Sequence, residues 1–529
     1  MATHAEVIAS RIRKAGIEYA FGLPGGEVVA LIDALRREGV RFYLTGHEAS
    51  AAFMAEVTGQ LTGRPGVCVS TLGPGAMNLM LGLSNARLDR GPVLALTAAI
   101  STSIERHFPH QRLPLTMVFK AICKASATVD GQGTGDLTDW CLEVAAGAPP
   151  GPVHLALPSN LATETVAPTG SPAASHKEAG AAEVAGRGLQ ELATLLAKAQ
   201  RPLLMVGVGC LNRDVPALRN FVDATGIPFV VTPKVKGYLS EDACGFLGVI
   251  SGMAIDKVVL ETIDRADLLL GVGFDPVECD KPWYVNRTVA NLSRYPTAEG
   301  DYDPVECLGE IDANLNRLQA ETGVKSWPEK LMLERRAAIS PEPMGSSGGL
   351  SPLKAIRVLR EALPPETVLT CDVGSHKYFA GQFWRSYEAQ TFFMSNGLSA
   401  MGYGIPAAIA VKVHFPNRPV VALVGDGGML MMQHNLVFLK QYEVPIIIIC
   451  LVDNSLSLIR IAQERRGLDP YGVDFPSPDF SVLARGYGLG GVRVRTIGTL
   501  RSAIGRALEA RTSTVVHIPV DVREYRALC

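Results

Sequence analysis

The stretch from Val420 to Asn454, VVALVGDGGMLMMQHNLVFLKQYEVPIIIICLVDN, decides the fold class of this chain. Two apolar runs of strand length, VVALV and PIIIICLV, flank a segment long enough for one helix. This pattern predicts two buried parallel strands that are joined by one helix-length crossover. Because parallel strands end at the same edge of a sheet, where ligands of open α/β sheets bind, the stretch predicts an α/β fold with a site at this edge.

The two strand ends carry the groups that a metal ion and a phosphate require. Asp426 and Asp453 lie 27 positions apart, one after each apolar run. Carboxylates, carbonyls and phosphate oxygens are the ligands that Mg²⁺ prefers, so this pair is a candidate site for one hard cation. Gly427 and Gly428 would let the backbone approach a phosphate closely. A Gly-Asp-Gly tripeptide alone is more often an ordinary turn, and the whole strand, turn, helix and strand pattern carries the prediction.

Length, charge and cysteine usage exclude several classes of protein. The 529 residues predict about three to four domains. The net charge of −2 shows no footprint for nucleic acid, and no apolar run is long enough to span a membrane. The N-terminal segment MATHAEVIASRIRKAG reads as an amphipathic helix, not as a secretory signal. Ten cysteines without a CxxC pair predict buried thiols in a reducing compartment, and we expect a cytoplasmic protein.

Two stretches rich in Ala, Pro, Ser and Gly divide the chain into three blocks. They run from Thr163 to Gly188 and from Ser340 to Pro352, and they predict domains at residues 1–165, 186–335 and 350–529. In each block short apolar runs alternate with helical patterns, which predicts three parallel-sheet α/β domains. The segment after Trp283, RTVANLSRYPTAEGDYDP, looks irregular, and no strand is expected there.

The Gly-Asp-Gly turn, its spacer and the Asp453-Asn454 pair resemble the diphosphate-and-metal motif of thiamine-diphosphate (ThDP) enzymes, and most closely that of acetolactate synthases. The resemblance implies bound ThDP and Mg²⁺, with Asp426 as a metal ligand and Gly425, Gly427 and Gly428 at the diphosphate. An ungapped count from Pro445 favours Asp453 as the second ligand and the Ser455 carbonyl as the third, with Asn454 as the alternative. It also implies a pyrimidine-binding, a central and a diphosphate-binding domain, of which the first and last share one topology.

The N-terminal block carries a second part of the resemblance, in TGHEASAAF and the following STLGPGAMN. Glu48 begins a helix, where an acid favours the helix dipole. In the family this Glu hydrogen-bonds the cofactor's aminopyrimidine and favours the tautomer that removes the poorly acidic C2 proton, so Glu48 is the leading catalytic candidate. Gly73 and Gly75 are expected to shape a loop beside the substrate, and Asn78 to support the cofactor or to start a helix.

Further along this block, ERHFPHQRLP matches a Phe-Gln-Glu segment of acetolactate synthases at Gln111. An amide there can hold a substrate oxygen, so Gln111 is the second catalytic candidate. The flanking Phe and Glu are absent, because His110 and Arg112 stand in their places. Lys124 aligns with a family lysine, although a surface role is the simpler interpretation.

Two segments of the C-terminal block extend the resemblance. CDVGSHKYF matches a family segment around the diphosphate, which assigns Gly374, Ser375 and His376 to cofactor binding. In SNGLSAMGYG, Met401 matches the methionine that wedges between the two rings of ThDP, and the Ser399 carbonyl matches the acceptor for its 4′-amino group.

Positions at which the chain departs from the family limit the expected substrate preference and cofactor requirement. The segment SLIRIAQERRG resembles a mobile cover of the site, and it has Ala462 where biosynthetic enzymes carry a Trp that favours 2-oxobutyrate. GVGFDPVEC resembles the catabolic branch, with Gly273 where flavin-dependent synthases carry an Arg. The glycine loop GVGCLN, residues 207–212, lacks its third glycine. We therefore expect no catalytic FAD.

The resemblance spans the chain and implies an enzyme like catabolic acetolactate synthase. Such an enzyme decarboxylates a 2-oxo acid such as pyruvate and joins the remaining unit to a second 2-oxo acid. It also implies a homodimer as the minimal active unit, assembled further into a homotetramer, with Glu48 of one subunit serving the cofactor of the other. Two alternatives remain: a ThDP-dependent lyase or simple decarboxylase for a larger 2-oxo or 2-hydroxyacyl substrate, and a ThDP-binding regulator without turnover.

Overall fold

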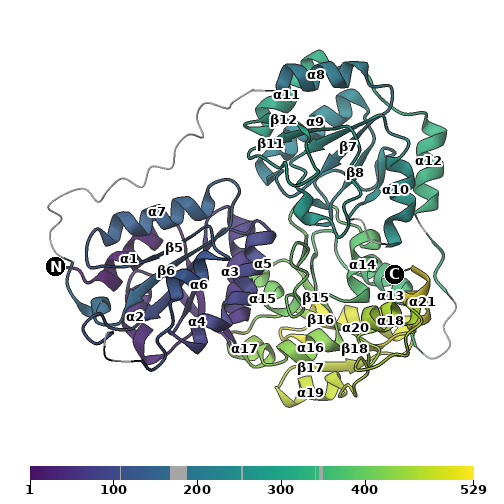
Figure 1. The fold of residues 1–529 in the computed structure, drawn as a ribbon. Coiled ribbons are helices and arrows are strands. Elements are labelled where there is room, and N and C mark those ends of the chain that lie inside the picture. The colour runs from purple at the N-terminus through teal and green to yellow at the C-terminus, as the bar shows by residue number, and fades with distance from the viewer. Residues whose placement is uncertain are drawn as a thin grey trace. The chain divides into compact units, whose positions relative to one another are not determined.

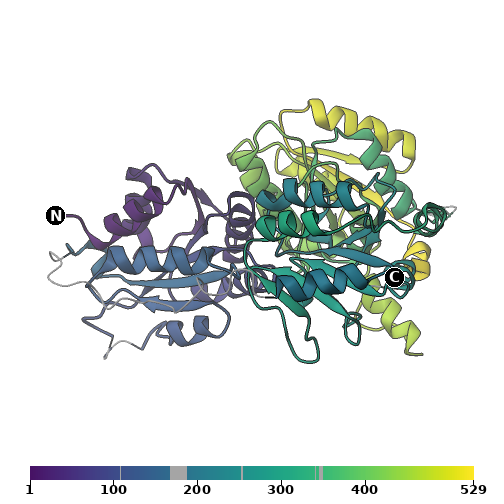
Figure 2. The ribbon, with the colours of Figure 1, turned by 90° about the horizontal axis from the view of Figure 1, so that it is seen from above.

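The computed structural model describes residues 1–105, 107, 109–166, 188–251, 254–339, 341–344 and 349–528, so parts of both predicted linkers lie outside it. The described chain folds into three six-stranded sheets in which all paired strands run parallel (Figure 1). Figure 2 shows the alternation of strands and helices in each block from a second direction. The prediction of three parallel-sheet α/β folds is therefore confirmed.

The N-terminal sheet contains β1 (Tyr19–Leu23), β2 (Arg41–Leu44), β3 (Gly66–Ser70), β4 (Val93–Ala99), β5 (Ala125–Thr128) and β6 (Pro152–Pro158). Its helices are α1 (His4–Lys14), α2 (Val29–Arg37), α3 (Glu48–Thr62), α4 (Pro74–Asn78), α5 (Met80–Leu88), α6 (Leu115–Lys120) and α7 (Thr134–Ala146). α1 packs on α2 and α7, whereas α3 packs on α5. Two separate helix layers follow from right-handed connections on a parallel sheet.

The central sheet contains β7 (Pro202–Val206), β8 (Phe229–Val231), β9 (Phe246–Val249), β10 (Leu268–Val272), β11 (Val289–Ser293) and β12 (Val305–Leu308). α8 (Leu189–Lys198), α9 (Val215–Thr225) and α11 (Ile311–Glu321) lie on one side of it, and α10 (Lys257–Ile263) and α12 (Glu329–Ala338) lie on the other (Figure 1). The order β12-β11-β10-β7-β8-β9 is that of doubly wound dinucleotide-binding folds.

β11 corrects one expectation. It lies in the segment after Trp283 that looked irregular, and all five of its residues are buried. Two of them are polar, which hides the strand in the sequence. The Asn291 amide donates to the Phe274 carbonyl and to Thr297, and Ser293 Oγ donates to the Tyr295 carbonyl. These hydrogen bonds make burial of the polar groups tolerable.

The C-terminal sheet contains β13 (Val368–Cys371), β14 (Phe392–Met394), β15 (Val420–Gly425), β16 (Ile447–Val452), β17 (Gly490–Arg493) and β18 (Thr514–Pro519). Its helices are α13 (Pro352–Ala362), α14 (Ser375–Phe383), α15 (Gly404–His414), α16 (Asp426–Met432), α17 (Asn435–Gln441), α18 (Ser457–Arg465), α19 (Phe480–Gly486), α20 (Ile497–Glu509) and α21 (Arg523–Leu528). The crossover from β15 to β16 is thus two short helices instead of one continuous helix.

The first and last sheets share one topology, as the resemblance implies. Their strand orders are β2-β1-β3-β4-β6-β5 and β14-β13-β15-β16-β18-β17, which become identical when each sheet is numbered from its own first strand. The order reverses between β1 and β3 in one sheet and between β13 and β15 in the other. Ligands of open α/β sheets bind at such points, outside the carboxyl ends of the strands.

Packing divides the chain into two compact units that do not follow the blocks of the sequence. The first unit combines the N-terminal sheet with residues 409–415 and 432–442, and the second contains the central and C-terminal sheets. In the first unit, the Asn435 amide donates to Ser50 Oγ (3.2 Å), and the Leu44 amide donates to the Tyr442 hydroxyl (2.7 Å). In the second, the Gln382 side chain bonds both backbone groups of Val249.

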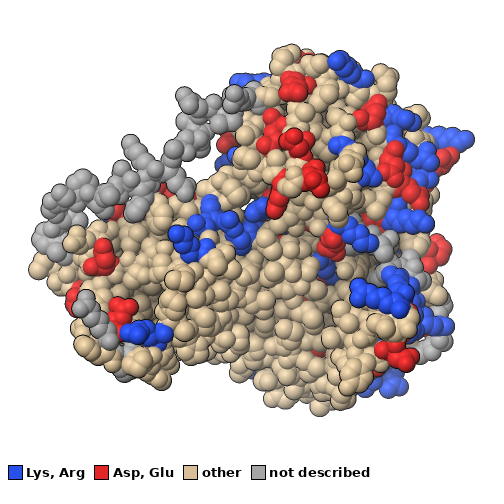
Figure 3. All heavy atoms as spheres, in the orientation of Figure 1, with Lys and Arg blue, Asp and Glu red and all other residues tan. Residues whose placement is uncertain are grey.

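Surface charge and cysteine state fit the composition. On the face shown in Figure 3, basic and acidic side chains are interspersed without a continuous field of one sign. The nine cysteines within the described ranges are all free, and seven of them are buried. None of the helices that the structure describes has the length and apolar character needed to cross a membrane.

Candidate functional site

Glu48 is held at the carboxyl edge of the N-terminal sheet. β2 ends at Leu44, and α3 begins at Glu48 after His47, whose Nδ1 accepts the Ala49 amide at 3.1 Å. The Glu48 side chain is only 4% exposed, and Asn78 Nδ2 donates to its Oε2 at 3.0 Å. A carboxylate that is buried against a neutral amide keeps its second oxygen available for another hydrogen bond.

Two glycines shape the loop next to Glu48. A Cβ at Gly75 would lie 2.9 Å from Thr71 Cγ2 and 3.0 Å from Glu48 Oε1, so a larger residue would press on both side chains. Gly73 has a φ of 59°, and a Cβ there would lie 3.1 Å from Gln111. The fold thus brings Glu48, Asn78 and Gln111 to one loop region, although Gln111 is distant from the others in sequence.

The neighbours of these residues have ordinary structural roles. His110 and Arg112 are exposed, and Arg112 donates to the Glu105 carbonyl at 2.6 Å. Lys124 Nζ donates to the carbonyls of Val144 and Gly147 at the end of α7, where a cation stabilises the helix dipole. Lys124 is therefore half-buried and caps a helix.

Asp426 and Asp453 meet at the carboxyl edge of the C-terminal sheet. β15 and β16 pair in register up to Gly425 and Leu451, which places the two aspartates after neighbouring strands. Asp426 Oδ2 accepts the amides of Asn454 (2.7 Å) and Asp453 (3.2 Å). Asp453 accepts the Ser455 amide at 3.1 Å and the Ser457 hydroxyl at 2.7 Å.

The electrostatics of this pair suit a divalent cation. Burial, and then the nearby charge of Asp426, raise the pKa of Asp453 to about 6. A cation between two such carboxylates would relieve their repulsion. Within the described ranges no group of three or more His, Cys, Asp or Glu side chains gathers as a metal site. The remaining ligands of a cation here would therefore be carbonyls, phosphate or water.

Asn454 points to a different partner. Its φ is 59°, its Oδ1 accepts the Ser477 amide at 3.1 Å, and its carbonyl accepts the Phe475 amide at 3.1 Å. Ser477 Oγ also donates to Asp426 Oδ2 at 2.8 Å, so the segment after α18 closes over the Gly-Asp-Gly turn. The choice between Asp453 and Asn454 as ligand stays a prediction.

Each glycine of the turn lies close against a side chain, so that a Cβ would be tight at two of the positions and would clash at the third. At Gly427 the Cβ would lie 3.1 Å from Met401 Cε, and at Gly425 it would lie 3.1 Å from the His376 ring. At Gly428 it would collide with the Asp372 carboxylate. The structure therefore gathers Met401, His376 and the glycine turn at one point of the sheet edge.

His376 offers an unused nitrogen at this point. α14 begins at Ser375, directly after Gly374, and the His376 ring is buried. Burial lowers the pKa of His376 to about 4, so the ring is neutral near pH 7. Its Nε2 has no hydrogen-bond partner among the described residues. A buried polar nitrogen without a partner beside a glycine turn fits a phosphate-bearing cofactor.

Three residues of this edge were missed by the sequence reasoning. Lys377 is 2% exposed and donates to Ser399 Oγ at 2.9 Å, while Ser399 has a φ of 55°. Asp372 accepts the amide of Gly402 at 2.8 Å, next to Met401. Asp372 and Lys377 lie within the quoted segment CDVGSHKYF, which could have drawn attention to them, whereas Ser477 reaches Asp426 only through tertiary folding.

At the switch point of the central sheet, backbone amides of a glycine loop bond to groups of the chain itself. The Val208 amide, in the glycine loop after β7, donates to Glu278 Oε2 at 2.7 Å. The Gly209 amide donates to the Gly273 carbonyl at 2.8 Å, and Gly273 has a φ of 62°. Burial raises the pKa of Glu278 to about 8. The chain's own backbone and a carboxyl group thus occupy this edge.

Three family profiles match the chain in the order of the three sheets. They are the N-terminal TPP binding domain, the central domain and the C-terminal TPP binding domain of thiamine pyrophosphate enzymes, at residues 2–118, 189–317 and 372–518.

Similar curated proteins cover nearly the whole chain. The acetolactate synthase isozyme 2 large subunit of Escherichia coli (strain K12) is 30% identical, over 98% of this chain and 96% of its own length. The acetolactate synthase of Bacillus subtilis (strain 168) is 28% identical, over 98% and 93%. The catabolic acetolactate synthase of Raoultella terrigena is 26% identical, over 98% and 95%.

Proposed function

This chain belongs to the acetolactate synthase-like family of thiamine-diphosphate-dependent enzymes, and we propose that it uses ThDP and Mg²⁺ to decarboxylate a pyruvate-like 2-oxo acid and join the remaining unit to a second 2-oxo acid. The observation that carries the proposal is Glu48, a buried carboxylate held by Asn78. ThDP supplies an acidic carbon and an electron sink for the decarboxylation.

The chain's own residues divide the remaining tasks. Glu48 would form a hydrogen bond with the cofactor's pyrimidine ring and favour the tautomer that removes the C2 proton. Asp426 and Asp453 would hold Mg²⁺, with the Ser455 carbonyl as a further ligand and Asn454 as the alternative to Asp453. His376, Ser375 and the glycines of the turn would hold the diphosphate. Met401 would lie against the cofactor, and Gln111 would orient a substrate oxygen.

We further propose that the reaction needs no flavin. The names of the relatives do not select a branch, because the isozyme 2 large subunit and the catabolic synthase match almost equally well. The support comes from Glu278, which takes the Val208 amide that a dinucleotide phosphate would need. A position that raises the pKa of a carboxyl group to about 8 disfavours negative charge, and it disfavours a pyrophosphate for the same reason.

The direct experiment incubates the purified protein with pyruvate, ThDP and Mg²⁺, without flavin, and measures acetolactate and acetaldehyde. Acetolactate as the main product supports the proposal. Acetaldehyde as the main product would favour the decarboxylase alternative. Failure to turn over pyruvate, together with turnover of a larger 2-oxo acid, would favour the lyase or decarboxylase with a larger substrate. A strict requirement for added FAD would refute the flavin argument.

We also propose a homodimer as the minimal active unit, in which Glu48 of one subunit serves the cofactor clamp of the other. Two variants test this arrangement, Glu48→Gln and Asp426→Asn, both assayed at a ThDP concentration too low to load the weakened Asp426→Asn site. When they are mixed and reassembled, each mixed dimer contains one site with both residues intact, so about a quarter of the wild-type activity should return. Sites formed within one subunit would give no recovery. Sedimentation analysis of the same samples distinguishes a dimer from a tetramer.

A further inference from the structure

A cavity of about 250 Å³ lies in the second compact unit, between α12 of the central block and α13 and α14 of the C-terminal block. It is separate from the cofactor site. α14 begins at Ser375, beside the Gly-Asp-Gly turn, and its last residues, Gln382 and Phe383, line the cavity. The nine residues of this helix span about 13 Å at 1.5 Å per residue.

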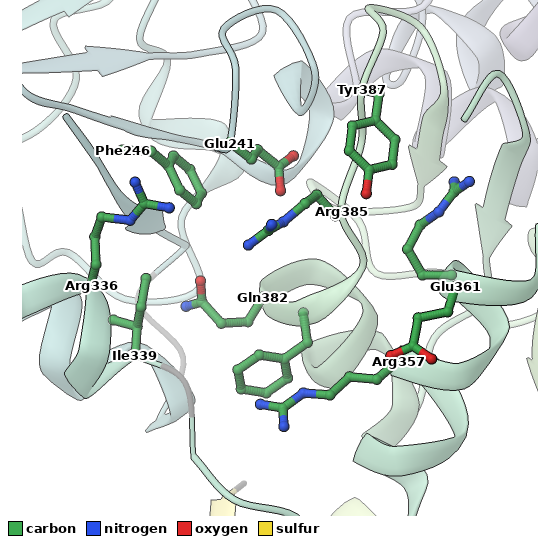
Figure 4. A pocket seen from close by; sticks show the side chains of 11 residues that line it. Glu241, Phe246, Arg336, Ile339, Arg357, Glu361, Gln382, Arg385 and Tyr387 are labelled. Atoms are coloured by element: carbon green, nitrogen blue, oxygen red, sulfur yellow. The ribbon is translucent and has the colours of Figure 1, made fainter. Parts of the chain in front are cut away.

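Arginines dominate the lining. Arg336, Arg357, Arg360 and Arg385 line the cavity together with two acids, Glu241 and Glu361. Figure 4 shows the side chains of Arg336, Arg357 and Arg385 around Gln382, each coming from a different element.

The two acids of the lining already have cationic partners. Glu241 pairs with the buried Lys236 at 2.9 Å, and Glu361 pairs with Arg501 at 2.5 Å. The charges of the two acids are therefore balanced by Lys236 and Arg501, which do not line the cavity. Among the four arginines, Arg385 pairs with Asp242.

The other three arginines donate only to backbone carbonyls. Arg336 donates to Asp242 and Ala243, Arg357 to Pro341, and Arg360 to Leu363 and Pro364. No acidic side chain of the described chain forms an ion pair with Arg336, Arg357 or Arg360. Three guanidinium groups thus lie around one cavity without a carboxylate at ion-pair distance, although the charge of Glu366 acts on Arg360 from further away.

Arg360 is the strongest sign of a missing anion. Its side chain is 7% exposed, and its Nε and Nη1 atoms have no hydrogen-bond partner among the described residues. The guanidinium lies over the rings of Trp384 and Tyr387, at 4.8 and 5.2 Å from their centres, which holds it in place. A buried cation with unused donors is unfavourable unless an anion completes its hydrogen bonds.

We propose that this cavity binds a small organic phosphate, which the guanidinium groups of Arg336, Arg357 and Arg360 hold between the central and C-terminal blocks. Guanidinium groups match phosphate oxygens in geometry and charge. Phe246, Ile339 and Phe383 provide apolar walls for an organic part. The volume is just below the range of about 300–1,000 Å³ for drug-sized ligands, so the ligand is compact. The site is independent of the proposed reaction and lies outside the cofactor's clamp.

The test uses the full-length holoenzyme, saturated with ThDP and Mg²⁺, and titrates it with glycerol phosphate by calorimetry. We expect saturable binding with one site per chain. Arg357→Gln, at a half-buried position, should weaken it at least about tenfold, because it removes one charge-assisted contact. Arg360→Gln should abolish it. Arg506→Gln, at an exposed position on α20, is the matched control and should bind as the wild type does.

Four results would overturn the proposal. They are the absence of saturable binding, equal affinity in all variants, loss of binding as free ThDP is raised, and tighter binding of succinate than of glycerol phosphate. The third would place the phosphate in the cofactor site, and the fourth would assign the cavity to a dicarboxylate. If Arg360→Gln does not fold, Arg357→Gln and its control still decide the outcome. Circular dichroism and ThDP content show whether each variant is intact.

Discussion

The N-terminal and C-terminal sheets have the same strand order but carry different groups at their carboxyl edges. The N-terminal edge holds a single buried carboxylate, Glu48, against the amide of Asn78. The C-terminal edge holds two carboxylates, Asp426 and Asp453, above a turn of glycines. One scaffold thus carries a single carboxylate in the first sheet and a pair of carboxylates beside a glycine turn in the last, and we propose that they serve as a proton site and a metal-and-phosphate site.

The two sheets show that different residues determine the strand order and the chemistry of the sites. Buried apolar runs define the strands of both sheets, whereas a few residues just after the strands define each site. The central sheet shows the same separation. Its switch point also has a glycine loop, but Glu278 accepts the hydrogen bond from the Val208 amide that a phosphate would otherwise accept. Replacing single residues at each edge should therefore change one function at a time.

The largest effect is expected at Glu48. Glu48→Gln keeps the size of the side chain and removes its charge, so turnover of the 2-oxo acid should fall by about 10²–10⁴-fold. ThDP content, measured by fluorescence after oxidation to thiochrome, should match that of the wild type. Loss of bound ThDP in this variant would instead assign Glu48 to cofactor retention.

The opposite pattern is expected at the other sheet. Asp426→Asn removes a carboxylate from the proposed metal site, so the affinity for ThDP in the presence of Mg²⁺ should fall by at least about tenfold. Titrating the apo-protein with ThDP at fixed Mg²⁺ measures this change. Turnover at saturating ThDP should recover in part, because Glu48 is intact. Unchanged affinity would remove Asp426 from the clamp.

A smaller difference should separate the two neighbours after β16. Asp453→Ala should weaken Mg²⁺-dependent ThDP binding more than Asn454→Ala, because Asp453 shares its electrostatic environment with Asp426 while Asn454 bonds Ser477. The Mg²⁺ concentration for half-maximal ThDP binding ranks the two variants. The reverse ranking would move the ligand to Asn454.

Gly75 tests how closely the position of Glu48 matters. A Cβ at this residue would lie 3.0 Å from Glu48 Oε1, so Gly75→Ala should displace the carboxylate and lower kcat by about tenfold. Gly63→Ala is the matched control for a glycine change in this block, since a Cβ there has no neighbour within 4 Å. Its φ of 69° will cost some stability, and kcat should stay near the wild-type value.

The smallest effect concerns the central sheet and pH. The folded-state pKa of Glu278 is about 8, above its usual value of 4.5, so the folded protein binds more protons than the unfolded chain between these pH values. Stability from this group is full below about pH 4.5 and falls as pH rises towards 8. The Tm of Glu278→Gln should therefore fall less than the wild-type Tm between pH 5 and 8. Parallel curves would show that Glu278 does not titrate in this window.

Patterns within the sequence were enough for the sheets but not for every contact. VVALV and IIIICLV are continuous apolar runs, so β15 and β16 were predictable. β11 contains Asn291 and Ser293, whose side chains are buried in hydrogen bonds that the local pattern does not show. The break between α16 and α17 also escaped prediction. Residues 432–442 pack on the N-terminal sheet, which a local pattern does not encode.

The residues of the candidate site also fall into those that sequence motifs indicate and those that only tertiary contacts bring together. Glu48, Asp426 and Met401 were singled out because motifs surround them, and their roles stay predictions. Lys377 and Ser477 were not predicted, because each reaches its partner across 22 or 51 positions of sequence. The ligand register at Asp453 and Asn454 stays a prediction, since both follow the same strand.

The most direct test of the division of labour is deuterium exchange at the C2 position of bound ThDP, measured by acid quench and NMR in wild type and Glu48→Gln at equal cofactor content. If Glu48 activates the cofactor, exchange should be fast in the wild type and should fall in the variant by about 10²–10⁴-fold, towards the rate of free ThDP. Equal exchange rates in the two proteins would contradict the account.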